Sequence, residues 1–363
     1  MNERKLARTI VALGLTGMFV VGTATAAAEP ARETGTREIT LAYVTTQQHP
    51  YGQAIDYFAA QVSRLSGGSL KIVPRPSYPA AEPTLLNDVR TGTIPMATMS
   101  TAVFDSAGIT AFQALQAPFL VNGYPLEKQI IAGRLGRSIS ARATQQAGNL
   151  YVLAIHEGGI RFPLGSTKSF TSVNAFKGAK IRSVQSKVLF TGLQALGASP
   201  DPLPLPEVYL ALKNGTVDGM EANIGLIATN KYFEVAKNVT ANLPLWPFPT
   251  ALSINRAFYN SLSRSEQTAL RTAANLVPAY SIGIVSKKST LPQDLVNCGV
   301  KFKYARNSEV LKLQALGRKA YSTLARDATT RQFLTAIQKI KADFKPPVAK
   351  RFPSTTTGSC TLS

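Results

Sequence analysis

The feature that most constrains the fold of this chain is a recurring unit of helix, glycine stop and strand. Residues 85–94 and 208–217 match in register: each has a helical stretch, a basic residue, a polar residue followed by Gly-Thr, and a β-branched strand start. Strand and helix patterns alternate around both segments, which is typical of βαβ units and mostly parallel sheets. The repeat therefore predicts an α/β protein made of two lobes of similar design.

The expected elements follow from apolar spacing, proline starts and glycine stops. Strands are expected at residues 38–45, 69–73, 94–99, 179–184 and 216–220. Helices are expected at residues 50–65, 83–91, 186–196 and 206–213, and further ones at 263–276, 309–324 and 331–344. Ser263 and Glu266 have the spacing of a capping box at the start of one of these helices.

The repeat also predicts where a ligand would bind. In its register Ser100 and Asn223 occupy equivalent places, each just past the carboxyl end of a strand. In open α/β sheets, ligands bind beyond the carboxyl ends of the strands. We therefore expect a binding site between the two lobes.

The first 28 residues have the pattern of a cleavable signal peptide. Arg4, Lys5 and Arg8 precede the uncharged apolar run 10–21, and Ala24-Thr25-Ala26 has the small-x-small form of a cleavage site. The run is shorter than the ~20 residues needed to span a bilayer, although an uncleaved anchor is the alternative. No cysteine follows that would carry a lipid. We expect an exported chain, periplasmic or at the cell surface.

Cysteine and histidine usage argues for a disulfide and against a metal site. Cys298 and Cys360 are the only cysteines, and in an oxidising compartment such a pair is expected to form one disulfide. Zinc usually takes four ligands, and only His49 and His156 could add to the cysteines. His49, which precedes Pro50, has the position of a helix cap. We expect neither a metal nor a cofactor.

The charge of the chain favours acidic partners without naming one. The formal net charge is +20, and residues 301–351 contain thirteen Lys or Arg against three acidic residues. Small anions, nucleic acid and an anionic surface are all compatible with this excess. A basic stripe interleaved with aromatic residues, or zinc-finger spacing, would indicate nucleic acid, and neither occurs. We expect no nucleic-acid partner, and a monomer.

Four ordered motifs in the second half resemble one protein family. They are residues 176–182 (Phe-Lys-Gly-Ala-Lys-Ile-Arg), 195–200 (Ala-Leu-Gly-Ala-Ser-Pro), 206–212 (Pro-Glu-Val-Tyr-Leu-Ala-Leu) and 215–221 (Gly-Thr-Val-Asp-Gly-Met-Glu). Weaker matches occur at residues 49–52, 66–68, 117–120 and 159–161. Through these motifs the chain resembles, from about Ile39 to Phe344, the dicarboxylate-type solute-binding proteins of tripartite ATP-independent periplasmic (TRAP) transporters.

The resemblance implies a two-lobed periplasmic-binding-protein fold. Each lobe is expected to be a mixed, mostly parallel sheet flanked by helices, with extra helices at the C-terminus. The expected division is a signal peptide at 1–28, lobe I at 39–158 and 248–288, lobe II at 159–247 and 289–306, C-terminal helices at 307–346 and a tail at 347–363.

The resemblance places a carboxylate-binding arginine at Arg182. A guanidinium offers a planar fork of donors that matches two carboxylate oxygens and keeps its charge, which a lysine does not reproduce. A surface arginine at a strand end is the alternative. Arg161 matches a second arginine of the family's site, with a structural ion pair as its alternative, and Gln185 matches a polar ligand contact.

The chain departs from the family pattern at four further candidate positions. Glu221-Ala222-Asn223 stands where the family has Glu-Asn-Pro, which displaces Asn223 by one residue and would turn its side chain to the other face of a strand. In the first lobe Glu82 matches an acidic position but its neighbouring arginine is lost. Ser100 replaces an acidic residue of some members. These changes leave undecided which residues contact the end of the ligand that lies away from its carboxylate.

Three more residues complete the candidate ligand-binding set. Thr45 and Gln47 follow the first strand and can bond hydroxyl or carbonyl oxygens, although polar loop residues are often only solvated. Trp246, the only tryptophan, lies among prolines near the expected crossing between lobes. It is expected either to line the cleft or to pack in the hinge.

The sequence therefore predicts a binding protein that captures a small organic carboxylate and delivers it to the membrane subunits of a transporter. It is not expected to be an enzyme, because nucleophile-elbow, phosphate-loop and zinc-protease motifs are all missing. An enzyme acting on organic acids, a binding protein for another importer or sensor, and a surface-adhesion module remain alternatives. Which organic acid is bound stays open.

Overall fold

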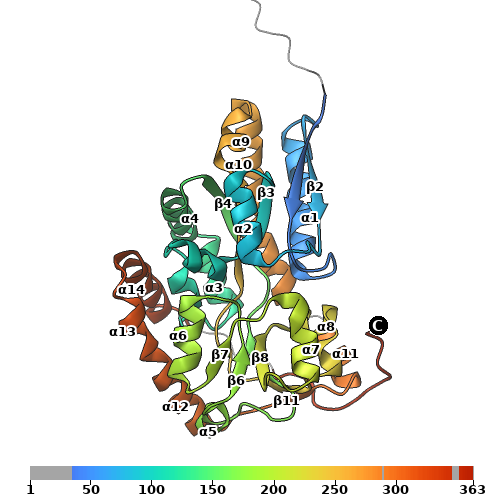
Figure 1. The fold of residues 1–363 in the computed structure, drawn as a ribbon, viewed down its shortest axis with the longest axis vertical. Coiled ribbons are helices and arrows are strands. Elements are labelled where there is room, and N and C mark those ends of the chain that lie inside the picture. The colour runs from blue at the N-terminus through green and yellow to red at the C-terminus, as the bar shows by residue number, and fades with distance from the viewer. Residues whose placement is uncertain (1–34, 288–289, 346–350, 363) are drawn as a thin grey trace, which may run out of the picture. The chain divides into compact units, whose positions relative to one another are not determined.

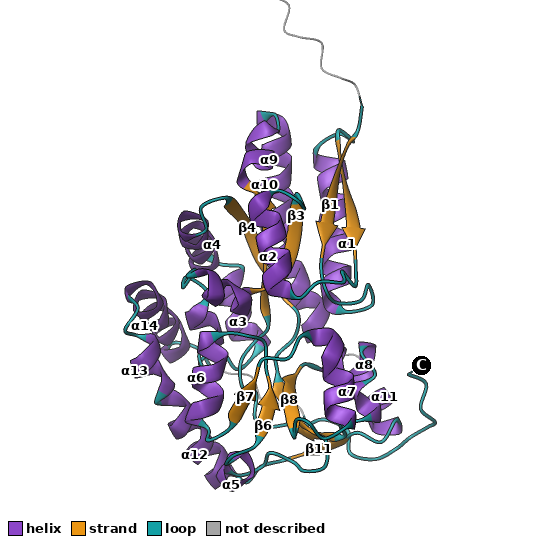
Figure 2. Ribbon diagram, viewed as in Figure 1, coloured by secondary structure: helices purple, strands orange, loops and turns teal. Residues whose placement is uncertain are grey.

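Two β-sheets organise residues 36–363 in a computed structural model, which describes residues 35–287, 290–345 and 351–362 (Figures 1 and 2). The predicted signal peptide lies outside the described residues. Among the helices described, none is both long and apolar enough to cross a membrane. Each sheet lies at the centre of one lobe, as the two-lobed α/β prediction requires.

The sheet of lobe I has five strands in the order β2-β1-β3-β10-β4. Their bounds are β1 Arg37–Ala42, β2 Leu70–Arg75, β3 Met96–Ser100, β4 Leu150–Glu157 and β10 Pro249–Asn255. β1 pairs in parallel with β2 and β3, whereas β10 runs antiparallel to both β3 and β4. Every residue of β3 and β10 is buried, as expected of central strands covered on both faces.

The sheet of lobe II has six strands in the order β11-β9-β5-β8-β6-β7. Their bounds are β5 Phe162–Gly165, β6 Lys180–Arg182, β7 Ser199–Asp201, β8 Gly219–Ala222, β9 Asn238–Thr240 and β11 Lys301–Lys303. β6 is parallel to β7 and β8, and β5 is antiparallel to β8 and β9. β5 and β10, the strands that follow a crossing from the other lobe, are thus antiparallel to their neighbours.

Helices flank both sheets (Figure 2). Those of lobe I are α1 Pro50–Leu65, α2 Glu82–Thr91, η1 Thr101–Ala107, η2 Gln113–Gln116, α3 Tyr124–Ile131, α4 Arg134–Gln146, α9 Arg256–Ser261 and α10 Arg264–Ser286. Those of lobe II are α5 Val173–Phe176, α6 Lys187–Ala195, η3 Leu205–Glu207, α7 Val208–Lys213, α8 Ile224–Thr229, η4 Tyr232–Glu234 and α11 Leu291–Asn297.

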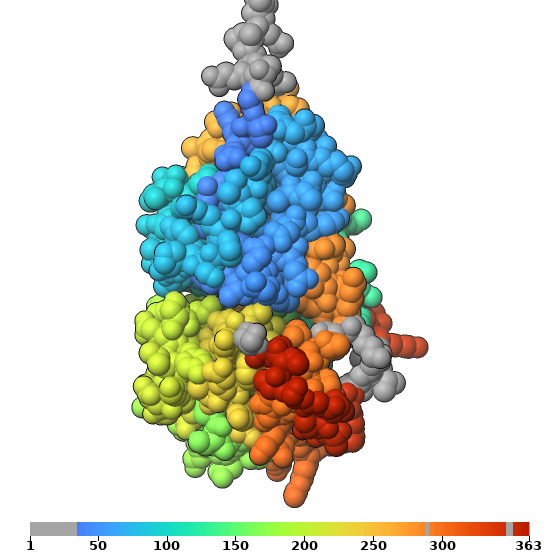
Figure 3. Space-filling model, turned by 90° about the vertical axis from the view of Figure 1, so that its right-hand side faces the viewer, coloured from blue at the N-terminus to red at the C-terminus, as the bar shows by residue number. Residues whose placement is uncertain are grey.

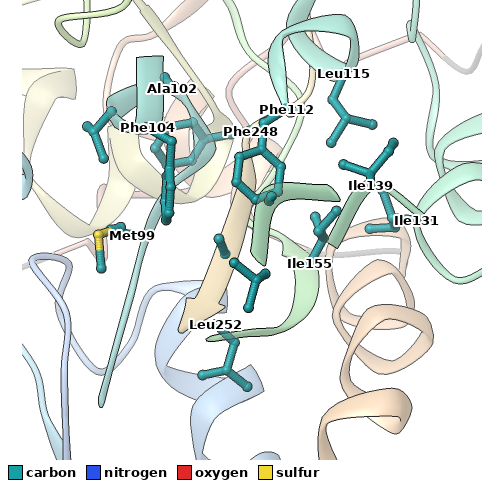
Figure 4. Packing of buried hydrophobic residues seen from close by; sticks show 14 of the residues in the cluster. Met99, Ala102, Phe104, Phe112, Leu115, Ile131, Ile139, Ile155, Phe248 and Leu252 are labelled. Atoms are coloured by element: carbon teal, nitrogen blue, oxygen red, sulfur yellow. The ribbon is translucent and has the colours of Figure 1, made fainter. Parts of the chain in front are cut away.

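The core of lobe I forms where helices cover the β10–β4 pair. Figure 4 shows Ile155 of β4 near the ring of Phe112, with Phe104 beside that ring and Leu252 of β10 farther away in the same cluster. The two phenylalanine rings meet edge to face with centroids 5.0 Å apart, a favoured aromatic geometry. Burial of these side chains fixes the strands that lead into the second lobe.

Three C-terminal helices connect the lobes from one side: α12 Asn307–Arg318, α13 Ala320–Leu324 and α14 Ala328–Ala342. α12 and α13 pack against α6 of lobe II, and α14 packs against η2 and α3 of lobe I. Thr330 Oγ1 donates to Gln113 Oε1 at 2.7 Å, and Lys341 Nζ donates to the Phe119 carbonyl at 2.7 Å. The extra C-terminal helices therefore belong to the frame of the binding fold.

The predicted elements were found, most of them with bounds that differ by one to three residues, and the helix expected at 206–213 is divided into η3 and α7. The expected strand 216–220 is β8, which begins at Gly219 because Thr216 N–H still bonds to Ala211 of the preceding helix at 2.9 Å. The helix expected at 309–324 is divided into α12 and α13. The helix expected at 263–276 continues to Ser286, and its capping box of Ser263 and Glu266 is confirmed.

The C-terminal tail is fastened to lobe II. Cys298 and Cys360 form a disulfide with their Cα atoms 4.5 Å apart, and Thr357 N–H donates to Asn297 Oδ1 at 3.0 Å. The ring of Phe352 stacks on Phe302 of β11 with centroids 4.6 Å apart. Figure 3 shows the tail, in red, lying against the orange segment of this lobe. The disulfide thus closes a loop that spans much of the C-terminal region.

Removing this disulfide should lower the free energy of unfolding. The two cysteines are 62 residues apart, and freeing a loop of this length enlarges the unfolded ensemble. We expect Cys298→Ser with Cys360→Ser to lose about 2–4 kcal/mol in urea unfolding. Reductant should shift the native protein to the same midpoint and leave the double variant unchanged. An identical midpoint for all samples would contradict a stabilising role.

Candidate functional site

Two antiparallel segments form the crossing between the lobes. The chain passes from β4 to β5 through Gly158 and Gly159, and returns to β10 through Trp246 and Phe248. Gly158 N–H donates to the Phe248 carbonyl at 3.2 Å, and the Arg161 N–H donates to the Trp246 carbonyl at 2.9 Å. Gly159 has a φ of +124°, and a Cβ there would lie 2.9 Å from the Cβ of Asn223. Only glycine suits this position.

A buried carboxyl pair reinforces the crossing. Glu157 Oε1 accepts hydrogen bonds from Gly159 N–H at 2.6 Å and from Phe248 N–H at 3.0 Å, which joins the two segments. The Glu127 carboxyl lies beside it. Burial and this acidic neighbour raise the pKa of Glu127 well above its ordinary value, so its protonated form is favoured. The crossing therefore does not bury two negative charges side by side at Glu157 and Glu127.

A cavity of about 100 Å³ lies between the lobes at this crossing. Lobe I contributes residues 44–45, Tyr78, residues 80–83 and Phe248, and lobe II contributes Arg161, Arg182, residues 184–185 and 202–206, and Leu226. Figure 3 shows the blue residues of lobe I in direct contact with the yellow-green residues of lobe II. The cavity lies beyond the carboxyl ends of β1 and β6, as expected for α/β sheets.

Arg182 is the last residue of β6 and lines this cavity. Its side chain is buried, and Nε donates to the Leu203 carbonyl at 2.9 Å, which fixes the plane of the guanidinium. Nη1 is buried without a hydrogen-bond partner among the described residues. Burial lowers the pKa of Arg182, with Glu221 acting in the opposite direction. The site thus holds a cation with at least one donor left for a ligand.

Arg161 also lines the cavity, but its charge is already paired. Nη1 donates to both the carbonyl and the Oε2 of Glu221 in β8. Ser183 Oγ donates to the other carboxylate oxygen of Glu221 at 3.0 Å. The guanidinium lies over the ring of Phe248, with Cζ 3.6 Å from its centroid. Both alternatives for Arg161 are therefore present: it contacts the cavity and forms a buried ion pair.

Three other predicted residues line the cavity. Glu82 is the first residue of α2, and its Oε1 accepts a hydrogen bond from Ser100 N–H at 2.8 Å. Burial raises the pKa of Glu82, opposed by that hydrogen bond and by Arg161. Thr45 Oγ1 is buried and has no hydrogen-bond partner among the described residues, and Gln185 is exposed at the rim.

The other five predicted residues lie around the cavity but not in its wall. Glu221 and Ser100 stand behind Arg161 and Glu82, which they position through the hydrogen bonds above. Gln47 is half-buried; it accepts a hydrogen bond from Tyr43 Oη and donates to Asp56. Contact of these residues with a ligand stays a prediction.

Asn223 and Trp246 have structural contacts. Asn223 caps the N-terminus of α8, where its Oδ1 accepts a hydrogen bond from Leu226 N–H at 2.7 Å. Trp246 is fully buried at the crossing, and its ring lies 3.2 Å from the position a Cβ would take on Gly192. The structure thus favours the hinge alternative for Trp246.

The two histidines lie behind the cavity. His49 Nδ1 accepts a hydrogen bond from Tyr51 N–H at 3.2 Å at the start of α1, which confirms its interpretation as a helix cap. Burial lowers the pKa of both His49 and His156 to about 3, so both rings are neutral near pH 7. His156 Nε2 bonds to Thr98 Oγ1 at 2.7 Å.

Sequence reasoning missed much of the wall. Residues 202–206, Pro-Leu-Pro-Leu-Pro, line the cavity directly after β7, and Phe248 supports Arg161. Polar residues were sought at strand ends, whereas this stretch is apolar. Its place immediately after a strand end was the signal that could have found it. Ser183, which donates to Glu221, directly follows the end of β6 and had the same signal.

The fold has two α/β lobes, and a small cavity with charged side chains lies between them. This arrangement is typical of solute-binding proteins. The family model of the bacterial extracellular solute-binding proteins, family 7, matches residues 41–326. The chain belongs to this family, whose members include binding proteins of TRAP transporters.

Curated relatives and solved structures agree with this assignment. The 2,3-diketo-L-gulonate-binding protein YiaO of Escherichia coli is 27% identical over 78% of this chain and 83% of its own length. The C4-dicarboxylate-binding protein DctP of Rhodobacter capsulatus is 26% identical over 69% and 74%. A TRAP solute-binding protein from Bradyrhizobium, solved with galacturonate, shares the fold with a TM-score of 0.78 at 24% identity, over 84% of this chain and all of that one.

Proposed function

We propose that this protein captures a small organic carboxylate in the cavity between its lobes and delivers it to the membrane subunits of a TRAP transporter. The observation that carries the proposal is Arg182, a buried arginine at a strand end in an interlobe cavity, with an N–H that has no partner in the part of the chain that the structure describes. A buried donor without a partner is unfavourable by about 1–3 kcal/mol, which a ligand oxygen would relieve. The named ligands of the relatives, sugar acids and dicarboxylates, support the same chemistry.

The proposed cycle uses the crossing as a hinge. The ligand carboxylate docks on Arg182 of lobe II, and lobe I then brings Thr45 and Glu82 over it. The closed state is favoured because only there does the ligand contact both lobes. The signal-peptide pattern of the first 28 residues supports an exported protein, and binding without chemistry fits a family of solute-binding proteins.

A thermal-shift screen of the chain from residue 29 onward tests this proposal. An organic acid that binds should stabilise the protein by about 2.7 kcal/mol at a concentration of one hundred times Kd. The amide of the same acid is the control, because it keeps the shape and loses the charge. Mass spectrometry should recover the acid unchanged after incubation. A panel of organic acids without any stabilising member, or turnover of the acid, would contradict the proposal.

A further inference from the structure

Among the described residues that line the cavity, Arg182 is the one cation without a carboxylate partner, although the Arg161 Nε is also buried without a hydrogen-bond partner. Of the four charged side chains grouped there, Arg161 is paired with Glu221, and the two remaining are Arg182 and Glu82. The Arg182 side chain meets a backbone carbonyl but no carboxylate in any described hydrogen bond. One ligand carboxylate would therefore be matched by Arg182, and a second would lack a cation.

Glu82 makes that second carboxylate unfavourable. Its Oε1 is fixed by Ser100 N–H, and Ser100 is itself held because its Oγ accepts from Ala102 N–H at 3.2 Å. The charged and titratable groups around Glu82 are Arg161 and Arg182 from lobe II and Tyr51 from α1. With Arg182 engaged by the first carboxylate, a second one beside Glu82 would meet a like charge in a poorly solvated space.

The wall also limits how many hydroxyl groups a ligand can carry. Of the eighteen described residues that line the cavity, twelve have apolar side chains. Four of these are prolines, three of them at positions 202, 204 and 206, and proline has no backbone N–H to donate. The Leu203 carbonyl already accepts from Arg182. A polyhydroxylated acid would bury several hydroxyl groups without partners.

The volume is consistent with a short molecule. A cavity of about 100 Å³ is far below the ~300 Å³ at which pockets for drug-sized ligands begin. The side-chain groups left to bond a polar substituent include Thr45 Oγ1 and the Glu82 carboxylate on the lobe I side and the Gln185 amide at the rim of lobe II. Thr45 can donate to a hydroxyl or carbonyl oxygen, and the Glu82 carboxylate can accept from a hydroxyl group.

We infer that this site selects a short monocarboxylate whose body is largely apolar and which carries one hydroxyl or carbonyl group, with Glu82 as the residue that excludes dicarboxylates. This inference rests on the proposed function. It separates the chain from the dicarboxylate and sugar-acid ligands named for its relatives, and it assigns that difference to Glu82 and the proline-rich wall.

Calorimetry with three matched acids tests the inference. The probes are 2-hydroxy-3-methylbutanoate, malate, a 2-hydroxy acid of similar size with a second carboxylate in place of the apolar end, and galactonate, which adds hydroxyl groups. We expect the first to bind roughly 10- to 100-fold tighter than malate, as expected for one like-charge contact in a partly buried site. Galactonate should also bind more weakly than the first probe.

The variant Glu82→Gln isolates the charge. It keeps the shape and the acceptor for Ser100 N–H, so the fold should be retained. We expect the affinity for malate to rise at least about tenfold relative to the affinity for 2-hydroxy-3-methylbutanoate. Glu207→Gln removes a carboxylate from an exposed position outside the cavity wall and should leave the ratio unchanged. An unchanged ratio in Glu82→Gln would overturn the role of Glu82.

The outcomes separate this inference from the proposed function. If malate or galactonate binds the native protein more tightly than the monocarboxylate, the inference is overturned. If Arg182→Ala abolishes that tighter binding, the proposed function stands and only the inference about monocarboxylates fails. If no organic acid binds at all, the proposed function itself has failed.

Discussion

Arg182→Ala should weaken carboxylate binding by roughly 30- to 5,000-fold. Truncating one partner of a buried charged pair changes the binding free energy by about 2–5 kcal/mol, which corresponds to that range. The guanidinium is held in place by the Leu203 carbonyl, so its orientation is set before the ligand arrives. Titration calorimetry with the acid found in the thermal-shift screen measures the loss.

Two control variants show whether the fork or the charge matters. Arg182→Lys keeps the charge but loses the planar pair of donors, and it should recover only part of the affinity. Arg137→Ala removes an exposed positive charge from α4 and should leave binding unchanged. Full affinity in Arg182→Ala would mean that the ligand carboxylate lies elsewhere.

Glu221→Ala should reduce the stability of the protein by about 3–5 kcal/mol, because it leaves the Arg161 charge buried and unpaired. The side chains of both residues are almost fully buried, at 2% and 0% exposure. Burial keeps water from replacing the lost partner. Urea unfolding followed by circular dichroism measures the change in free energy.

Two controls are the replacement of both members of the buried ion pair by apolar residues and the disruption of an exposed ion pair. Arg161→Met combined with Glu221→Leu removes both charges and should regain part of the lost stability. Glu38→Ala breaks the Lys71–Glu38 pair, whose side chains are 60% exposed, and should change stability by at most about 1 kcal/mol. Equal losses in Glu221→Ala and Glu38→Ala would show that burial of the Arg161 pair is unimportant.

Much of the fold could be predicted because its signals are local. Apolar spacing, prolines at helix starts and glycine stops act within a few residues, so they indicated α1, α2 and α6 with small errors in their bounds. The Gly-Thr repeat indicated two lobes of similar design. Bounds moved where a turn hydrogen bond extends a helix stop, as before β8.

Arg182 was accessible to sequence reasoning for a related reason. It ends a strand inside a dense family motif, and strand ends of α/β sheets converge on the ligand site. Thr45 was assigned to the site from its place after the first strand, and Glu82 from an acidic position of the family. The disulfide followed from there being only two cysteines in the chain.

The sequence by itself determined the alternation of strands and helices, the two-lobed class and the position of one arginine at a strand end. Only the tertiary structure decided that Arg161 is neutralised by Glu221, that Phe248 supports it, and that residues 202–206 form an apolar wall. These features depend on contacts between residues far apart in the chain. Local patterns carry no record of which distant side chains compensate a buried charge.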